Sequence, residues 1–146
     1  MLAAGIDLPD LNVWLAASLP DHAHHARAAR YWREEAADRV VFCRVTSLGF
    51  LRLCTNQTVM GGNPLTVQQA WDAYNAFSRL PEVVFLAEPD ALEPILGGWA
   101  AGGVFTGRHW TDAYLAAFAR AEDLRVVSFD RDFSRFPDIR FLQLIS

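Results

Sequence analysis

The chain has 146 residues, of which 52% are hydrophobic and 21% charged, and its net charge is −4. These values are typical of a compact domain, and they exclude both a disordered chain and a protein whose whole surface binds nucleic acid. All 13 basic residues are arginine, which excludes mechanisms that need a lysine, such as a Walker A phosphate site, a Schiff base or a kinase-type site.

Short apolar runs alternate along the chain with longer segments of helical period. In the first half we expect a strand at 5–8, helices at 11–18 and 21–37, a strand at 40–43 and a helix at 46–55. After a loop at 61–64 we expect a helix at 66–79, a strand at 83–86, a helix at 89–100 that breaks after Gly97 and Gly98, a helix at 111–122, and strands at 125–129 and 139–144. This alternation predicts one α/β domain over residues 1–146, built as three α/β/α layers around a mostly parallel sheet.

The remaining global features are those of a protein inside the cell. No apolar run reaches the roughly 18 residues that span a bilayer, and the first ten residues lack the basic start of a signal peptide. We therefore expect a cytoplasmic protein without membrane contact. Cys43 and Cys54 form no CxxC pair and lie in apolar stretches, so we interpret both as buried free thiols.

Three acids that are distant in sequence converge in the predicted fold. Asp10 follows the first strand, Asp130 follows the strand at 125–129, and Asp112 opens the helix that leads into that strand. Ligands of such sheets bind beyond the carboxyl ends of the strands, and clustered carboxylates repel one another unless a cation such as Mg²⁺ lies between them. The alternative is that each acid only caps a helix or turn.

Four segments resemble, in order, the motifs of PIN domains: Pro9–Leu15, Thr46–Leu53, Thr111–Ala117 and Val127–Phe133. The closest branch is the VapC-type toxins of bacterial toxin–antitoxin pairs, especially the mycobacterial kind. The resemblance implies an endoribonuclease that uses Mg²⁺ or Mn²⁺ to cut tRNA or ribosomal RNA and so arrests translation. It also implies a homodimer and a cognate VapB-type antitoxin that blocks the acidic crevice.

The resemblance also assigns roles to individual residues. It implies that Asp10, Asp112 and Asp130 are the catalytic, metal-binding carboxylates. The accessory residues that it implies are Asn12, beside Asp10, the hydroxyl residue Ser128 and the additional acid Asp132. One departure stands at Ser47, where many members have Glu. That departure keeps open a non-catalytic module that binds RNA or an antitoxin, and a DNA-directed nuclease is a second alternative.

Other polar residues near these motifs have two interpretations. Arg52 and Arg108 border the predicted crevice, where they would contact RNA phosphates or else remain solvated. His109 precedes Asp112 and lies near the mouth of the site. The cluster His22, His24 and His25 is interpreted as a solvated helix start rather than as a metal site. Trp14 and Trp32 are expected to pack between the first two helices.

Overall fold

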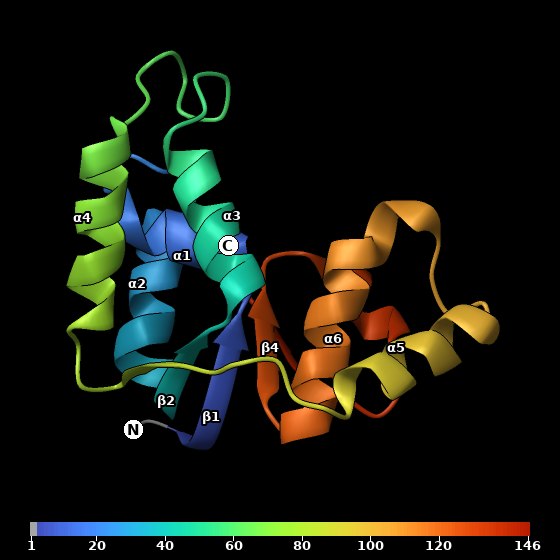
Figure 1. Cartoon of the computed structure of the whole chain (residues 1–146). Coiled ribbons are helices and arrows are strands. Elements are labelled where there is room, and N and C mark those ends of the chain that lie inside the picture. Colours follow the sequence, from blue (N-terminus) through green and yellow to red (C-terminus); the bar gives the residue numbers. More distant parts are fainter. Residues whose placement is uncertain (1–2) are drawn as a thin grey trace.

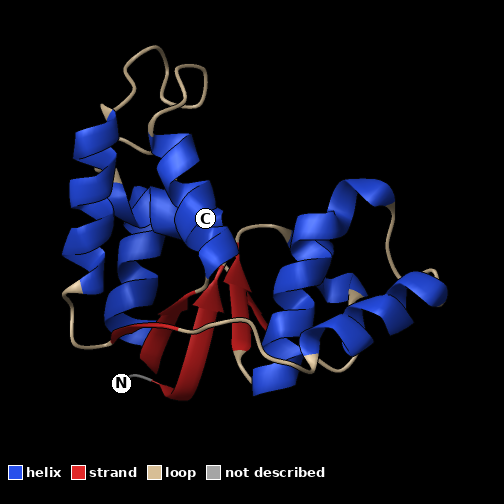
Figure 2. Ribbon diagram, viewed as in Figure 1, coloured by secondary structure: helices blue, strands red, loops and turns tan. Residues whose placement is uncertain are grey.

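The computed structural model describes residues 3–146. Within that range one sheet has the strand order β3-β2-β1-β4-β5, and all of its neighbouring strands pair in parallel (Figure 2). The strands are β1 (Ala3–Pro9), β2 (Ala37–Phe42), β3 (Val83–Phe85), β4 (Arg125–Ser128) and β5 (Arg140–Gln143). The prediction of a mostly parallel sheet is therefore confirmed.

Helices cover both faces of this sheet, which confirms the three-layer α/β/α architecture (Figure 1). One face carries α1 (Leu11–Ser18), α2 (His25–Arg30), α3 (Arg44–Cys54) and α4 (Val67–Ser78). The other face carries α5 (Leu92–Ala101) and α6 (Trp110–Glu122). Among the residues that the structure describes, no helix combines the length and the apolar character that a membrane span needs.

Alternate residues of the strands feed two separate cores. Val40, Phe42 and Val127 pack under α1 to α4, whereas Leu8, Val41 and Val126 pack under α5 and α6. Strands that are buried on both faces need continuous apolar runs, and this explains the composition of residues 40–43 and the pair Val126 and Val127.

Aromatic rings fill the core under α1 to α4. The ring of Trp14 stacks on Phe42 at a centroid distance of 3.6 Å and meets Trp32 edge-on at 5.7 Å, as the sequence predicts for the two tryptophans. Cys43 and Cys54 are both buried free thiols, also as predicted.

Two predicted helices differ from the structure. The helix expected at 21–37 begins only at His25, and after α2 it widens into a π-helical turn, Tyr31–Glu35, so that β2 begins at Ala37. Residues 21–24 form turns instead, in which the His22 Nδ1 accepts a bond from the backbone N–H of His24 at 3.0 Å. The π turn lets the Tyr31 hydroxyl reach the buried carboxylate of Asp7 at 2.6 Å, a tertiary contact that helical periodicity does not reveal.

The helix expected at 89–100 begins later, at Leu92, and does not break after Gly97 and Gly98. A glycine inside a helix costs only about 1 kcal/mol relative to alanine. The buried side chains of Leu92 and Trp99 anchor both halves of α5 in the core, and this packing outweighs the local preference to end the helix.

The order of the strands defines where a ligand site lies. From β1, the chain adds β2 and β3 on one side, then crosses through α5 and α6 to place β4 on the other side of β1. The connections therefore reverse direction between β1 and β4. The crevice beyond the carboxyl ends of two such strands is the usual ligand site of an open parallel sheet.

Candidate active site

Asp10 lies at this crevice, directly after β1, where it caps the N-terminus of α1. Its Oδ1 accepts a bond from the backbone N–H of Leu11 at 2.8 Å, and its Oδ2 accepts one from the Ser128 hydroxyl at 2.9 Å. The backbone N–H of Asp10 also donates to Val127 O at 2.8 Å. The Asp10 side chain is 7% exposed, so β1 and β4 together hold it in one orientation.

Ser128, the buried last residue of β4, connects the acids of the two strands. Its hydroxyl has one proton, which it donates to Asp10, and it accepts bonds from the backbone N–H of Asp130 at 2.9 Å and from the Asn12 Nδ2 at 3.3 Å. Asn12 therefore presents its amino group to Ser128. Its buried Oδ1 has no hydrogen-bond partner among the described residues, and such an oxygen calls for a water or a cation.

The other two predicted acids come from different elements. Asp130 caps the 3₁₀ turn Arg131–Arg135, and its Oδ1 accepts a bond from the backbone N–H of Asp132 at 2.8 Å. Asp112 lies half-buried in the first turn of α6. Asp10 and Asp130 thus do cap a helix and a turn, as the alternative interpretation expects. A cap uses only part of a carboxylate's capacity to accept bonds or bind a cation.

The predicted acids lie near enough to one another for their charges to change one another's pKa. Burial, and then the charges of Asp112 and Asp130, raise the pKa of Asp10 to about 6, against the opposing bonds from Ser128 and Leu11. The pKa of Asp112 is raised by burial first and then by Asp130. Buried carboxylates that repel one another are unstable as free anions, and a divalent cation relieves that conflict.

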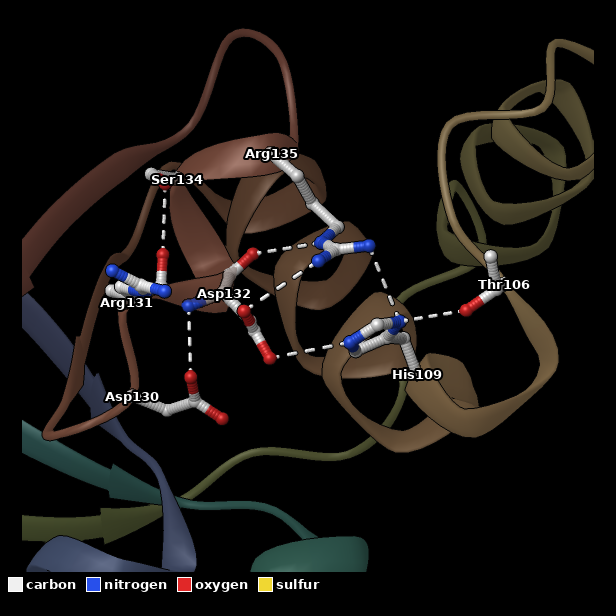
Figure 3. A network of polar contacts seen from close by, with 7 residues as sticks. All are labelled: Thr106, His109, Asp130, Arg131, Asp132, Ser134 and Arg135. Atoms are coloured by element: carbon white, nitrogen blue, oxygen red, sulfur yellow. Dashed lines mark hydrogen bonds and ion pairs between the residues drawn. The ribbon is translucent and has the colours of Figure 1, made fainter.

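A second group, which we call the Asp132 network, contains Thr106, His109, Asp132 and Arg135 (Figure 3). His109 Nε2 lies 3.2 Å from Asp132 Oδ2, and Arg135 Nη2 lies 3.5 Å from Asp132 Oδ1. The opposite nitrogen of the imidazole, Nδ1, lies 3.1 Å from Thr106 Oγ1 and 3.3 Å from Arg135 Nη1. The hydrogen bond from His109, together with the charge of Arg135, lowers the pKa of Asp132.

The donor chemistry suits a hard divalent cation. His109, Asp112 and Asp132 each offer a ligand atom within 4.8 Å of the others, and the charges of Asp130 and Asp132 both act on Asp112. Mg²⁺ prefers oxygen ligands and usually binds through one or two carboxylates plus substrate phosphate. The carboxylate side of the site therefore fits such an ion better than the imidazole does.

The structure separates the remaining candidates. The Ser47 hydroxyl is buried and exchanges bonds only with Arg44, at 3.1 and 3.2 Å, in the part of the chain that the structure describes. Arg108 is near enough to lower the pKa of Asp132 by its charge. Arg52 lies apart, eight residues or about 12 Å further along α3 than Arg44, in a groove of about 320 Å³ whose lining contains no acid.

The histidine cluster at the start of α2 does not converge on one point. His25 Nδ1 bonds to Ala16 O at 2.8 Å, while the ring of His24 stacks on Phe129 at 4.7 Å. The three rings are half-buried rather than fully solvated. Within residues 3–146, they do not form a group able to hold a metal.

Sequence reasoning missed Arg135 and Thr106 altogether and placed His109 only near the mouth of the site. The available signal was the pair of arginines that flank Asp132, at 131 and 135, in a turn too short for helical periodicity. Which of the two faces the acid depends on the 3₁₀ geometry of residues 131–135, where residues three apart are eclipsed.

Comparisons with known proteins agree with this geometry. The family described as "PIN domain" matches residues 8–139 of the chain. Ribonuclease VapC41 of Mycobacterium tuberculosis is 41% identical over 138 residues, which cover 90% of this chain and 94% of that protein. The residues that the family model matches include Asp10, Asp112, Asp130 and Asp132.

Solved structures share the fold at low sequence identity. A chain of VapBC2 from Rickettsia felis, crystallised with a DNA fragment of its promoter, has a TM-score of 0.68 at 12% identity and covers 97% of this chain and 100% of that chain. The sarcin–ricin-loop-cleaving toxin VapC20 of Mycobacterium tuberculosis has a TM-score of 0.63 at 21% identity, covering 89% and 93% of the two chains.

Proposed function

The chain belongs to the PIN-domain family, in its branch of VapC-type ribonuclease toxins. From this premise we propose that Asp10, Asp112 and Asp130 hold a divalent cation, and that the protein uses this cation to hydrolyse RNA. Membership confirms the resemblance carried by the four sequence motifs. The observation that supports the site assignment is that the charges of Asp112 and Asp130 raise the pKa of the buried Asp10, and that the charge of Asp130 raises the pKa of Asp112, at the crevice between β1 and β4.

The residues of this site fit Mg²⁺ or Mn²⁺. Asp10 is an anion that burial and its neighbours destabilise, and Asn12 Oδ1 is a buried acceptor without a partner among the described residues. When bound, the ion supplies an activated water and positive charge for the leaving oxygen. Asp10, Asp112 and Asp130 would hold it, with Asn12 beside them.

The chain's own groups then perform defined tasks. Ser128 and the N–H of Leu11 orient the Asp10 carboxylate and favour its charged form. Arg108, an exposed cation beside Asp132, is positioned to contact a phosphate of the RNA. Because Arg52 lies along α3 away from the acids, any phosphate that it contacts belongs to a more distant nucleotide.

We extend the proposal to a finer biological role, which family membership supports. We place the whole chain, as a single domain and a homodimer, in the cytoplasm, where it would cleave a structured tRNA or ribosomal RNA and pair with a VapB-type antitoxin. The ribosomal target is supported by the description of VapC20 as a toxin that cleaves the sarcin–ricin loop. The antitoxin is supported by the VapBC complex from Rickettsia felis, which shares the fold.

The test is cleavage of total bacterial RNA by purified protein, with Mg²⁺, with Mn²⁺ and with EDTA. We expect discrete products with either metal, none with EDTA, and none from Asp112→Asn, which keeps the shape of the side chain but removes its charge. A parallel reaction with duplex DNA should remain uncut. Cleavage that persists in EDTA or in Asp112→Asn would refute the assignment of the site.

The rival function is a module that binds RNA or an antitoxin without cutting. In such a module we would expect the acids to form ion pairs with arginine, which would neutralise their charge. Within residues 3–146, Asp10, Asp112 and Asp130 form no ion pair, whereas Asp132 does. This geometry favours catalysis, and specific RNA binding without products under either metal would instead support the rival.

A further inference from the structure

His109 is a buried polar side chain of the site for which the metal-binding role does not account. It ends the 3₁₀ turn Gly107–His109, is 4% exposed, and directly precedes α6, which carries Asp112. A histidine that is buried next to Asp112 and Asp132 would ordinarily be interpreted as a metal ligand. The hydrogen bonds of its two nitrogens argue for a different role.

The bonding pattern fixes the tautomer of the ring. Arg135 has only hydrogens to offer, and its Nη1 lies 3.3 Å from His109 Nδ1, so Nδ1 must accept. Nε2 is then the nitrogen that donates, and it faces Asp132 Oδ2 at 3.2 Å. Thr106 Oγ1, at 3.1 Å from Nδ1, can donate to the same acceptor. Neither nitrogen is left free to bind a cation.

As a result, each oxygen of the Asp132 carboxylate has a partner. Its Oδ2 faces His109, and its Oδ1 faces Arg135 Nη2 at 3.5 Å. Arg135 Nε also donates to the Asp132 backbone carbonyl at 3.2 Å. Figure 3 shows His109 and Arg135 enclosing this carboxylate, with Asp130 on the neighbouring side of the turn. Asp132 also acts on Asp112 through its charge.

We propose that His109 is a positioning residue: it donates from Nε2 to Asp132 and accepts from Arg135 at Nδ1, and so fixes the Asp132 carboxylate beside Asp112. The inference rests on the proposed function, because it concerns a carboxylate beside Asp112, which is assigned there to the cation. Partners of this kind orient the groups around a metal, and their loss typically lowers metal affinity or activity by roughly 10- to 100-fold.

The first test needs neither metal nor RNA. In ¹⁵N-resolved NMR spectra of the metal-free protein near neutral pH, we expect His109 to show one protonated nitrogen, Nε2, and one unprotonated nitrogen, Nδ1. The signal is assigned by its absence from His109→Gln. A ring protonated at Nδ1, alone or together with Nε2, would overturn the proposal, because Arg135 would then have no acceptor.

The second test compares two substitutions of the same residue. Gln retains an amide that can donate to Asp132 and an oxygen that can accept from Arg135, whereas Leu retains only bulk. We expect His109→Leu to lower kcat by roughly 10- to 100-fold with little change in KM for RNA, and His109→Gln to remain within about threefold of wild type. Equal losses in folded Gln and Leu variants would contradict a positioning role.

A double-mutant cycle shows whether His109 acts through Asp132. In an Asp132→Ala background, His109→Leu should cost less than about twofold in kcat, because the carboxylate that it positions is gone. Full additivity of the two losses would overturn the proposal. Thermal melts of all variants establish that each one is folded before its rate is compared.

Mn²⁺ binding separates this inference from the proposed function. In pulsed electron paramagnetic resonance spectra of the Mn²⁺-bound protein, we expect wild type to show no ¹⁴N coupling from His109. A coupling that disappears in His109→Gln would be such a signal. Such a coupling would make His109 a ligand and overturn the positioning role. If wild type fails to cleave RNA at all, the proposed function fails, whereas the tautomer and the Mn²⁺ spectrum still decide the role of His109.

Discussion

Asp10 shows how one side chain serves both the fold and the chemistry. As the N-cap of α1 it satisfies a free helical N–H, and as a nearly buried anion among other acids it has a pKa near 6 instead of 3.8. A raised carboxyl pKa means that the folded protein holds a proton that the unfolded chain has lost. In the absence of metal, this group therefore weakens the fold as the pH rises from about 3.8 through 6.

This linkage yields the first prediction. Without metal, Asp10→Asn should be more stable than wild type near neutral pH, by at most about 3 kcal/mol at 1.36 kcal/mol per pKa unit, and the gain should shrink as the pH falls to about 4. Asparagine still caps α1. Urea unfolding in EDTA at the two pH values measures the difference. A variant that is less stable than wild type at neutral pH would show that the ionised form is not penalised.

Ser128 provides the second prediction at this scale. Ser128→Ala leaves the partly buried Asp130 N–H without its acceptor and removes a bond that lowers the pKa of Asp10. We expect a loss of about 1–3 kcal/mol in the free energy of unfolding and a shift of the acidic limb of the cleavage profile to higher pH. Ser134→Ala, at an exposed hydroxyl that bonds to Arg131 O, should change neither quantity.

The sequence predicts these residues to different degrees. Asp10, Asp112 and Asp130 are recognisable because each lies at a defined boundary of an element, where chain order alone determines their convergence. Arg135 and Thr106 are not recognisable in this way. Their positions depend on two short 3₁₀ turns, Gly107–His109 and Arg131–Arg135, and a turn of three to five residues leaves no periodic signal.

At the scale of elements, the predictions held where burial and periodicity agree. Helix α6 runs over Trp110–Glu122 and is buried along its inner face, so its apolar period indicates its extent to within one residue. The start of α2 was missed because no side chain caps it. The π turn that follows was missed because it depends on a partner 24 residues away, Asp7.

Helix α4 allows a prediction that concerns stability alone. The Thr66 hydroxyl accepts a bond from the backbone N–H of Gln69 at 3.1 Å, and the Gln69 side chain accepts one from the backbone N–H of Thr66 at 2.9 Å. Thr66→Ala should lower the free energy of unfolding by about 1 kcal/mol, which is roughly 2–4 °C in Tm. Its kcat for RNA should equal that of wild type. A fall in kcat would mean that α4 contributes to the reaction.

At the scale of the molecule, the sheet lies between the two cores, and one buried carboxylate joins the central strands. Asp7, in β1, is 0% exposed and accepts bonds from Arg125 in β4, from the Tyr31 hydroxyl and from the backbone N–H of Ala37. Arg125 also donates to Glu35 O at 2.8 Å. The carboxylate thus links β1 and β4 to the π turn and to the start of β2. This arrangement holds in register the two strands that carry Asp10 and Ser128.

Breaking this junction should affect the whole fold rather than one site. Asp7→Ala leaves a partly buried Arg125 without its counter-charge. We expect the free energy of unfolding to fall by about 3–5 kcal/mol, a large part of the roughly 5–15 kcal/mol available to a domain.

Tyr31→Phe removes one of several donors to Asp7. It should lower the free energy of unfolding by about 1–3 kcal/mol, while the folded protein cleaves RNA at the wild-type rate. Urea unfolding and single-turnover cleavage below the midpoint of unfolding measure the two effects separately. A Tyr31→Phe variant of wild-type stability would show that the π turn is held by its backbone alone, and a slowed reaction would mean that the strand register, and with it Asp10, responds to Tyr31.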